Sequence, residues 1–174
     1  MVCSAVGWHG RNVAGVYAWG LHLRTHFSGS KLAADFIRRN GYENLLIVGS
    51  KEANVSPVTA YLNRPIYYPD SSRSGTYPYE TSARGDLFLQ EVMSRTAQLA
   101  MKAHQDALLV LKGYLTSSDK GRKGVLKAAY LYPDGDITSL SEPPTKPCVQ
   151  ITLLAQFMPV IVDEECSLYL IHPR

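Results

Sequence analysis

Two short runs of apolar residues, LLIVG at 45–49 and ALLVL at 107–111, place the strongest constraint on the fold of this chain. A strand with one face in water alternates polar and apolar residues, whereas a run that is apolar throughout is typical of a parallel strand covered on both faces. Parallel strands need long crossover connections, which are usually helices. The two runs therefore predict a parallel sheet with helices on both of its faces.

Helix signals stand between the predicted strands. Before the first apolar run, Ser28 or Ser30 is suited to cap a helix that ends at Gly41. Ser56 and Pro57 form an N-cap and first-turn pair, which predicts the start of a short second helix. The predicted elements of this part of the chain are a strand at 13–23, a helix to residue 39, the strand at 45–49, a helix at 56–62, a strand at 65–68, a helix at 82–104 and the strand at 107–111.

The last third of the chain has antiparallel patterns. A strand at 125–132 precedes the turn signal Pro-Asp-Gly-Asp at 133–136, and residues 137–140 are predicted to return beside it. The apolar segments 149–157 and 166–171 flank an acidic turn and predict a hairpin at the edge of the sheet. Because 174 residues suit one domain, residues 1–174 are predicted to form a single α/β domain. Its expected architecture is a three-layer α/β/α sandwich with a mostly parallel, mixed sheet and a C-terminal antiparallel hairpin.

Charge and hydropathy argue against two classes of partner. The net charge is +3 and the basic residues are scattered, whereas nucleic-acid binding favours a dense basic stripe, so we expect no nucleic-acid partner. The longest apolar stretch, residues 149–162, is shorter than the ~20 residues of a membrane-spanning helix, so no span is predicted. The N-terminus lacks the apolar core of a signal peptide, so any export signal would lie outside this chain or be absent.

The three cysteines, Cys3, Cys148 and Cys166, give no metal or disulfide signature. They are widely spaced and contain no CxxC pair, which argues against a zinc site and a disulfide framework. Cys148 and Cys166 lie in neighbouring strand-like segments. They are interpreted as buried apolar residues, with pairing in an oxidising compartment as the alternative.

A candidate binding site follows from the predicted parallel sheet. Ligands of open α/β sheets bind beyond the carboxyl ends of the strands, and those ends are polar and cationic in this chain. Tyrosines also gather near the strand at 65–68, where aromatic rings with hydroxyl tips suit sugar stacking, a protein interface or a half-buried edge strand. Turn and cap chemistry is the alternative explanation for the polar residues. The candidate ligand-binding residues are His26, Lys51, Tyr67, Tyr68, Ser72 and Arg73.

Motifs for catalysis are weak throughout the chain. The sequence has no GxSxG elbow, no GxxxxGK[ST] loop and no GxGxxG after its first strand, which argues against a serine hydrolase, a P-loop enzyme and a dinucleotide fold. His22 and His26 are four residues apart, but their predicted backbone is extended or turning, so the rings would point apart. We therefore expect no catalytic residue, no metal and no cofactor in this chain.

Several segments together carry a family resemblance: FSGSKLAADFI, LLIVGS, SPVTAYLNR, PIYYPDSSRSGTY and VDEECSLYLI. Their combination, over residues 26–172, resembles the C-terminal region of bacterial, notably cyanobacterial, multi-pass membrane glycosyltransferases of the dolichyl-phosphate-mannose-protein mannosyltransferase type. The resemblance implies an extracytoplasmic domain. It also implies that this domain is not catalytic, because the catalytic acidic residues of such enzymes lie on loops of their membrane portion. One departure is Ser50, since an acidic residue often follows the VG of this strand in the family.

Three functional hypotheses result. The first is a non-catalytic accessory or binding domain of a membrane-associated glycosyltransferase-like protein, on the extracytoplasmic face of a bacterial membrane, with a glycan or the membrane portion as its partner. The second is a stand-alone cytoplasmic enzyme or binding protein for a small phosphorylated or carboxylated ligand. It would use Arg73 and Lys51 as anion clamps and Ser72 or His26 as reactive groups. The third is an interaction module that has no small ligand.

Overall fold

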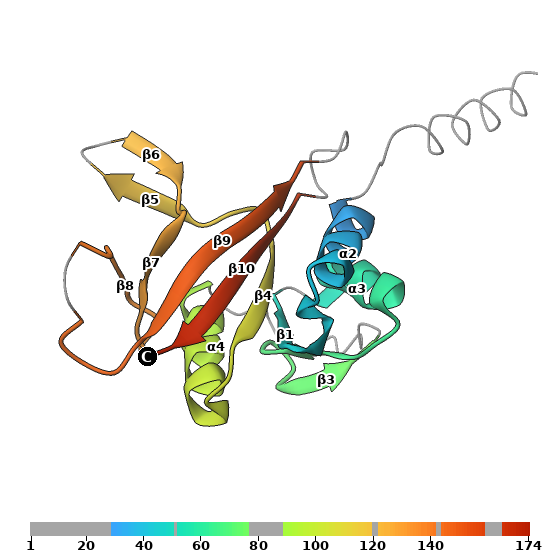
Figure 1. Cartoon of the computed structure of the whole chain (residues 1–174), viewed down its shortest axis with the longest axis horizontal. Coiled ribbons are helices and arrows are strands. Elements are labelled where there is room, and N and C mark those ends of the chain that lie inside the picture. The colour runs from blue at the N-terminus through green and yellow to red at the C-terminus, as the bar shows by residue number, and fades with distance from the viewer. Residues whose placement is uncertain (1–28, 51, 77–88, 120–121, 142–143, 159–164) are drawn as a thin grey trace, which may run out of the picture.

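The computed structural model of the chain describes residues 29–50, 52–76, 89–119, 122–141, 144–158 and 165–174. Within them, three α-helices pack on an eight-stranded mixed sheet, and a separate two-stranded hairpin, β5–β6, projects from one end (Figure 1). The helices are α2 (Gly29–Arg39), α3 (Glu52–Leu62) and α4 (Leu89–Ala103), with a short 3-10 helix, η1, at Tyr42–Asn44. The strands are β1 (Leu46–Gly49), β2 (Ile66–Tyr68), β3 (Arg73–Gly75), β4 (Ala107–Lys112), β5 (Thr116–Asp119), β6 (Arg122–Val125), β7 (Ala128–Leu131), β8 (Ile137–Thr138), β9 (Val149–Phe157) and β10 (Cys166–Pro173). The prediction of an α/β fold is confirmed.

The prediction of a mostly parallel sheet is wrong. The strand order is β3-β2-β1-β4-β10-β9-β7-β8, and only β1 pairs in parallel, with β2 on one side and β4 on the other. The other pairs of this sheet are antiparallel. The apolar runs in β1 and β4 thus predict their own parallel pairing correctly, but they give no information about the antiparallel pairs in the rest of the sheet.

The C-terminal hairpin is confirmed as a β9–β10 pair, but its expected place at the sheet edge is wrong. Strand β10 lies between β4 and β9, near the middle of the sheet. Its sequence explains this position, because Leu168 faces one side of the sheet while Tyr169 and Ile171 face the other, and each is 0% exposed. A strand that is apolar on both faces is stable only when both faces are covered.

Helices cover both faces of the sheet. On one face, α2 and α3 pack through residues such as Ile37 and Val58 onto Ile47 and Leu108. On the other face, α4 packs onto side chains of β1, β4, β7, β9 and β10, with Met93 fully buried. Since each fully buried aliphatic side chain contributes about 1.5–3 kcal/mol, these two cores are the main source of stability.

A β-bulge in β9 allows this strand to contribute side chains to the cores on both faces of the sheet. The register shifts between Leu168 and Tyr169 of β10, whose partners are Ala155 and Leu153, so Leu154 is an extra residue in β9. The bulge reverses which face the following residues occupy. Phe157 consequently packs against Phe36 of α2, with ring centroids 5.9 Å apart in an edge-to-face arrangement.

Several predicted boundaries hold and others change. The first helix and the strand at 45–49 are confirmed as α2 and β1, and the long helix is confirmed over residues 89–103. Helix α3 begins at Glu52 rather than at Ser56, so Pro57 lies inside the helix, where it has no N–H to donate in the helical hydrogen-bond pattern. The predicted strand at 125–132 is divided between β6 and β7. The expected strand at 13–23 and helix residues 82–88 lie outside the described residues.

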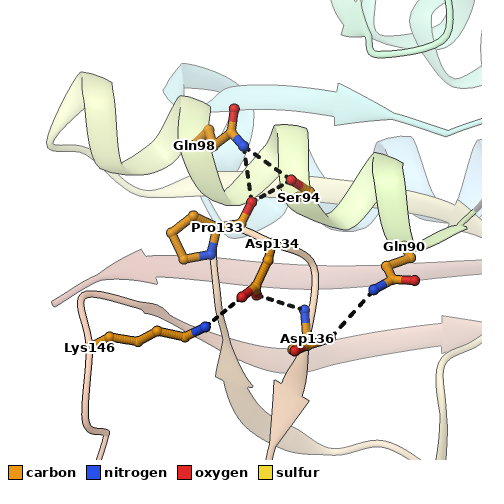
Figure 2. Close-up of polar contacts among 7 residues, drawn as sticks. All are labelled: Gln90, Ser94, Gln98, Pro133, Asp134, Asp136 and Lys146. Carbon is orange, nitrogen blue, oxygen red and sulfur yellow. Dashed lines mark hydrogen bonds and ion pairs between the residues drawn. The ribbon is translucent and has the colours of Figure 1, made fainter.

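Helix α4 is fixed to the turn between β7 and β8 by three side chains on one of its faces. Ser94 Oγ donates to the carbonyl oxygen of Pro133, and Gln98 Nε2 donates to the same oxygen at 2.9 Å (Figure 2). Gln90, one turn earlier, donates to Asp136 Oδ1 at 3.4 Å. Residues at i, i+4 and i+8 share one face of a helix, which is why these three reach the same turn.

The turn itself is ordered by Asp134. Its carboxylate accepts from the backbone N–H of Asp136 at 3.2 Å and from Lys146 Nζ at 2.5 Å (Figure 2). The hydrogen bond from Lys146 is the main reason why the pKa of Asp134 is lowered. The turn prediction for 133–136 and the return strand β8 are therefore both confirmed.

Cys148 and Cys166 are free thiols, and both are buried. Cys166 begins β10, whereas Cys148 precedes β9 beside the other end of β10. About eight residues of strand separate these positions, which corresponds to ~25 Å. A disulfide needs Cα atoms within about 7 Å, so the interpretation as buried apolar residues holds and the two thiols do not pair.

Candidate functional site

The carboxyl end of β1 is a topological switch point. From β1 the chain passes through α3 to β2 on one side, and α4 later leads to β4 on the other side. Crossovers that diverge in this way leave a crevice beyond the strand ends, where open α/β proteins bind ligands. Ser50, directly after β1, is buried at this end of the sheet, and its backbone N–H donates to the carbonyl oxygen of Val110 of β4 at 3.0 Å.

The segment after β2 is a tight turn and not an open loop. The backbone N–H of Ser72 donates to the carbonyl oxygen of Pro69 at 3.2 Å, and Ser72 has a left-handed φ of 54°. The chain then returns antiparallel to β2 as β3, with Arg73 opposite Tyr68. The Pro-Asp-Ser-Ser composition is typical of such a turn, so the turn can be predicted from the sequence.

Arg95 of α4 joins this turn to the helix. Its Nη1 donates to the carbonyl oxygen of Pro69 at 2.6 Å and to Ser72 Oγ at 2.9 Å. Its Nη2 donates to Glu91 Oε1, one helical turn earlier, at 2.7 Å. The sequence indicates only that Arg95 lies on the polar face of a helix. Its partner could not be predicted, because every residue has a backbone carbonyl whatever its side chain.

The structure brings some of the predicted site residues together. Ser72 contacts Arg95, Arg73 follows Ser72 as the first residue of β3, and Tyr67 packs on the α4 side of the sheet. Tyr68 is fully buried in the core under α2 and α3, so the two tyrosines face opposite sides. His26 and Lys51 lie outside the described residues, and their roles stay predictions.

The same edge carries a row of side chains that the sequence reasoning missed. Leu111 of β4 pairs with Ser167 of β10, and Ser167 pairs with Gln156 of β9. Because Gly49 pairs with Val110, Ser50 lies level with Leu111. We call Ser50, Leu111, Ser167 and Gln156 the carboxyl-edge row.

The carboxyl-edge row faces the α4 side, because Leu111 belongs to the core under α4. Ser167 is 0% exposed and Gln156 is partly buried. Polar residues inside the apolar segments CSLYLI and LLAQF are the signal that could have found them. They were not included in the predicted site because the hairpin that contains them was predicted to lie at the edge of the sheet.

Tyr169 lies one row deeper on the same face. Its hydroxyl oxygen accepts a hydrogen bond from the backbone N–H of Leu115 at 2.9 Å. Burial raises the pKa of Tyr169, and the bond from Leu115 opposes this in part. The phenol is therefore neutral at physiological pH and keeps its proton.

The comparisons add no relative. No protein-family model, no curated protein and no solved structure matches the chain. In the described part of the chain, His, Cys, Asp and Glu side chains form no group of three or more that could hold a metal ion. Across those same residues, no helix is both long and apolar enough to span a membrane.

Proposed function

We propose that this chain is a non-catalytic binding domain whose ligand site is the carboxyl edge of β2, β1 and β4. The supporting observation is the hydrogen bond from Arg95 to Ser72 Oγ. A serine nucleophile needs a base that accepts its proton, whereas a guanidinium is a donor that stays protonated. Ser72 is therefore held as part of a turn, which favours binding over the alternative in which Ser72 reacts.

The wider role that we propose is accessory. The resemblance over residues 26–172 supports a domain of a membrane-associated glycosyltransferase-like protein, exposed on the extracytoplasmic face of a bacterial membrane. There the domain would contact a glycan or the membrane portion. The gene tests this role directly, because it must then encode membrane spans joined to this domain, and a reading frame without them contradicts the accessory role.

Binding is tested by NMR titration of the ¹⁵N-labelled domain. The probes are D-mannose, a manno-oligosaccharide and a short-chain polyprenyl phosphate. We expect shifts at Ser50 and over residues 67–76, with the remote Arg39 at the end of α2 unaffected. Shifts that are absent for all three probes, or spread evenly over the surface, contradict the proposed site. Shifts with the phosphate alone support the alternative ligand class, a small anion.

A further inference from the structure

Two polar groups of the carboxyl-edge row are without a hydrogen-bond partner among the residues that the structure describes. Ser167 Oγ and Gln156 Nε2 are both buried, and neither is paired with a group in the part of the chain that the structure describes. They belong to residues directly opposite each other on β10 and β9. Buried polar groups are nearly always hydrogen-bonded in native proteins, so an adjacent pair of exceptions calls for a cause.

The position of the pair argues against a purely structural cause. Ser167 is flanked by Cys166 and Leu168, which belong to the opposite core, and faces the α4 side next to Leu111. An apolar side chain would extend the α4 core at this point without leaving a buried donor unpaired. The two donors lie at the strand end beyond which open α/β sheets bind ligands.

The chemistry of the row indicates what it would accept. Ser50, Ser167 and Gln156 can each donate and accept a hydrogen bond, and none of them is charged. An anion buried against neutral groups would lose its hydration without gaining a cation. A hydroxyl group, which also donates and accepts, matches this set of neutral groups.

We propose that the carboxyl-edge row binds a neutral, hydroxyl-rich small molecule, with Ser167 and Gln156 as its hydrogen-bonding residues. This proposal rests on the proposed function and extends that site across β4 to β10 and β9. Gln156 is only partly buried, so the ligand reaches the row from the β9 side. Ser167 then contacts the ligand at the buried end.

The test compares Ser167→Ala and Gln156→Met with a matched serine control, Ser94→Ala. D-Mannose and D-glucose are titrated into each ¹⁵N-labelled variant, and urea unfolding is measured in parallel. We expect each row substitution to weaken sugar binding about tenfold, which is about 1.4 kcal/mol. The urea midpoint should stay unchanged or rise, because an unpaired buried group is removed. Ser94→Ala should lower the midpoint and leave sugar binding unchanged, since Ser94 Oγ donates to Pro133 in the turn between β7 and β8, which is not part of the carboxyl-edge row.

The outcomes separate this inference from the proposed function. Sugar-induced shifts confined to residues 67–76, with none at Gln156 or Ser167, would overturn ligand binding by the carboxyl-edge row. They would still support the proposed function as a binding domain. A midpoint that falls in Ser167→Ala as it does in Ser94→Ala, with unchanged binding, assigns Ser167 a structural role and overturns the inference. Inorganic phosphate that competes with the sugars at Ser167 overturns the neutral ligand class. Shifts absent for every probe overturn the proposed function itself.

Discussion

Ser94 and Arg95 are consecutive residues of α4, yet they donate hydrogen bonds to the carbonyl oxygens of two prolines in opposite halves of the sheet. Ser94 binds Pro133, in the turn between β7 and β8, and Arg95 binds Pro69, in the turn between β2 and β3. Those two hairpins form the two edges of the eight-stranded sheet. One helix therefore fastens both edges, and the candidate site at the end of β2 depends on how α4 is held.

Arg95→Met should destabilise the protein by about 1–3 kcal/mol, because Pro69 and Ser72 lose their bonds to a charged donor. The loss of the Glu91 pair adds little, since the side chains of Arg95 and Glu91 are 34% and 44% exposed. Urea unfolding measures the change. Amide shifts of residues 70–73 should also move, because the turn is released from the helix.

Arg39→Met is the matched control for that change. Arg39 is exposed in the last turn of α2, away from both turns, so its substitution should alter stability by less than about 0.5 kcal/mol. Equal effects of the two substitutions would mean that the Arg95 contacts contribute no more than surface charge.

Ser94→Ala and Gln98→Ala should be non-additive. Gln98 Nε2 donates both to Ser94 Oγ at 3.1 Å and to Pro133 at 2.9 Å, so the three groups form one network. Each single substitution should cost about 0.5–1.5 kcal/mol. In a double-mutant cycle we expect a coupling of at least about 0.5 kcal/mol, and strictly additive costs would show that the two side chains act independently.

The sequence predicted the parts of this fold that depend on neighbours in the chain. Helix α2, strand β1 and the turn at 133–136 follow from caps, apolar runs and turn residues within a few positions. The place of β10 does not, because strand order is decided by pairing with residues far away in sequence. The apolar character of both faces of β10 was nevertheless a usable signal for a central strand.

Some parts of the candidate site could likewise be predicted from neighbours in the chain, and other parts could not. The carboxyl ends of β1 and β2 were located from sequence, because parallel runs imply which ends meet. Ser167 and Gln156 join that edge only through the antiparallel insertion of β10 and β9 beside β4. Arg95 reaches a backbone carbonyl 26 residues away, a partner that no residue pattern encodes.

Gly135→Ala should destabilise the protein more than Gly113→Ala. Both glycines have a left-handed φ, 91° and 76°, so an alanine is strained at either position, by about 1–2 kcal/mol. At Gly135 a Cβ would also lie 2.4 Å from the backbone oxygen of Gln90. At Gly113 a Cβ would have nothing within 4 Å among the described residues, its chain neighbours apart. Urea unfolding should show the larger loss for Gly135→Ala. Equal losses would show that the turn moves away from α4 at little cost.

Stability should fall at alkaline pH because of Cys166. Burial raises the pKa of this thiol from 9.0 to about 12, so the folded protein keeps a proton that the unfolded chain releases near pH 9. Where the folded state binds more protons, the free energy of unfolding decreases as pH rises, here from about pH 9 towards pH 12. Between pH 8 and pH 10, the free energy of unfolding should fall by about 1 kcal/mol less in Cys166→Ala than in the unsubstituted protein.

Cys148→Ala is the control, since the thiol of Cys148 is less desolvated and Arg174 opposes the rise of its pKa. An identical pH dependence for all three proteins would show that the Cys166 thiol titrates in the folded state as it does in the unfolded chain.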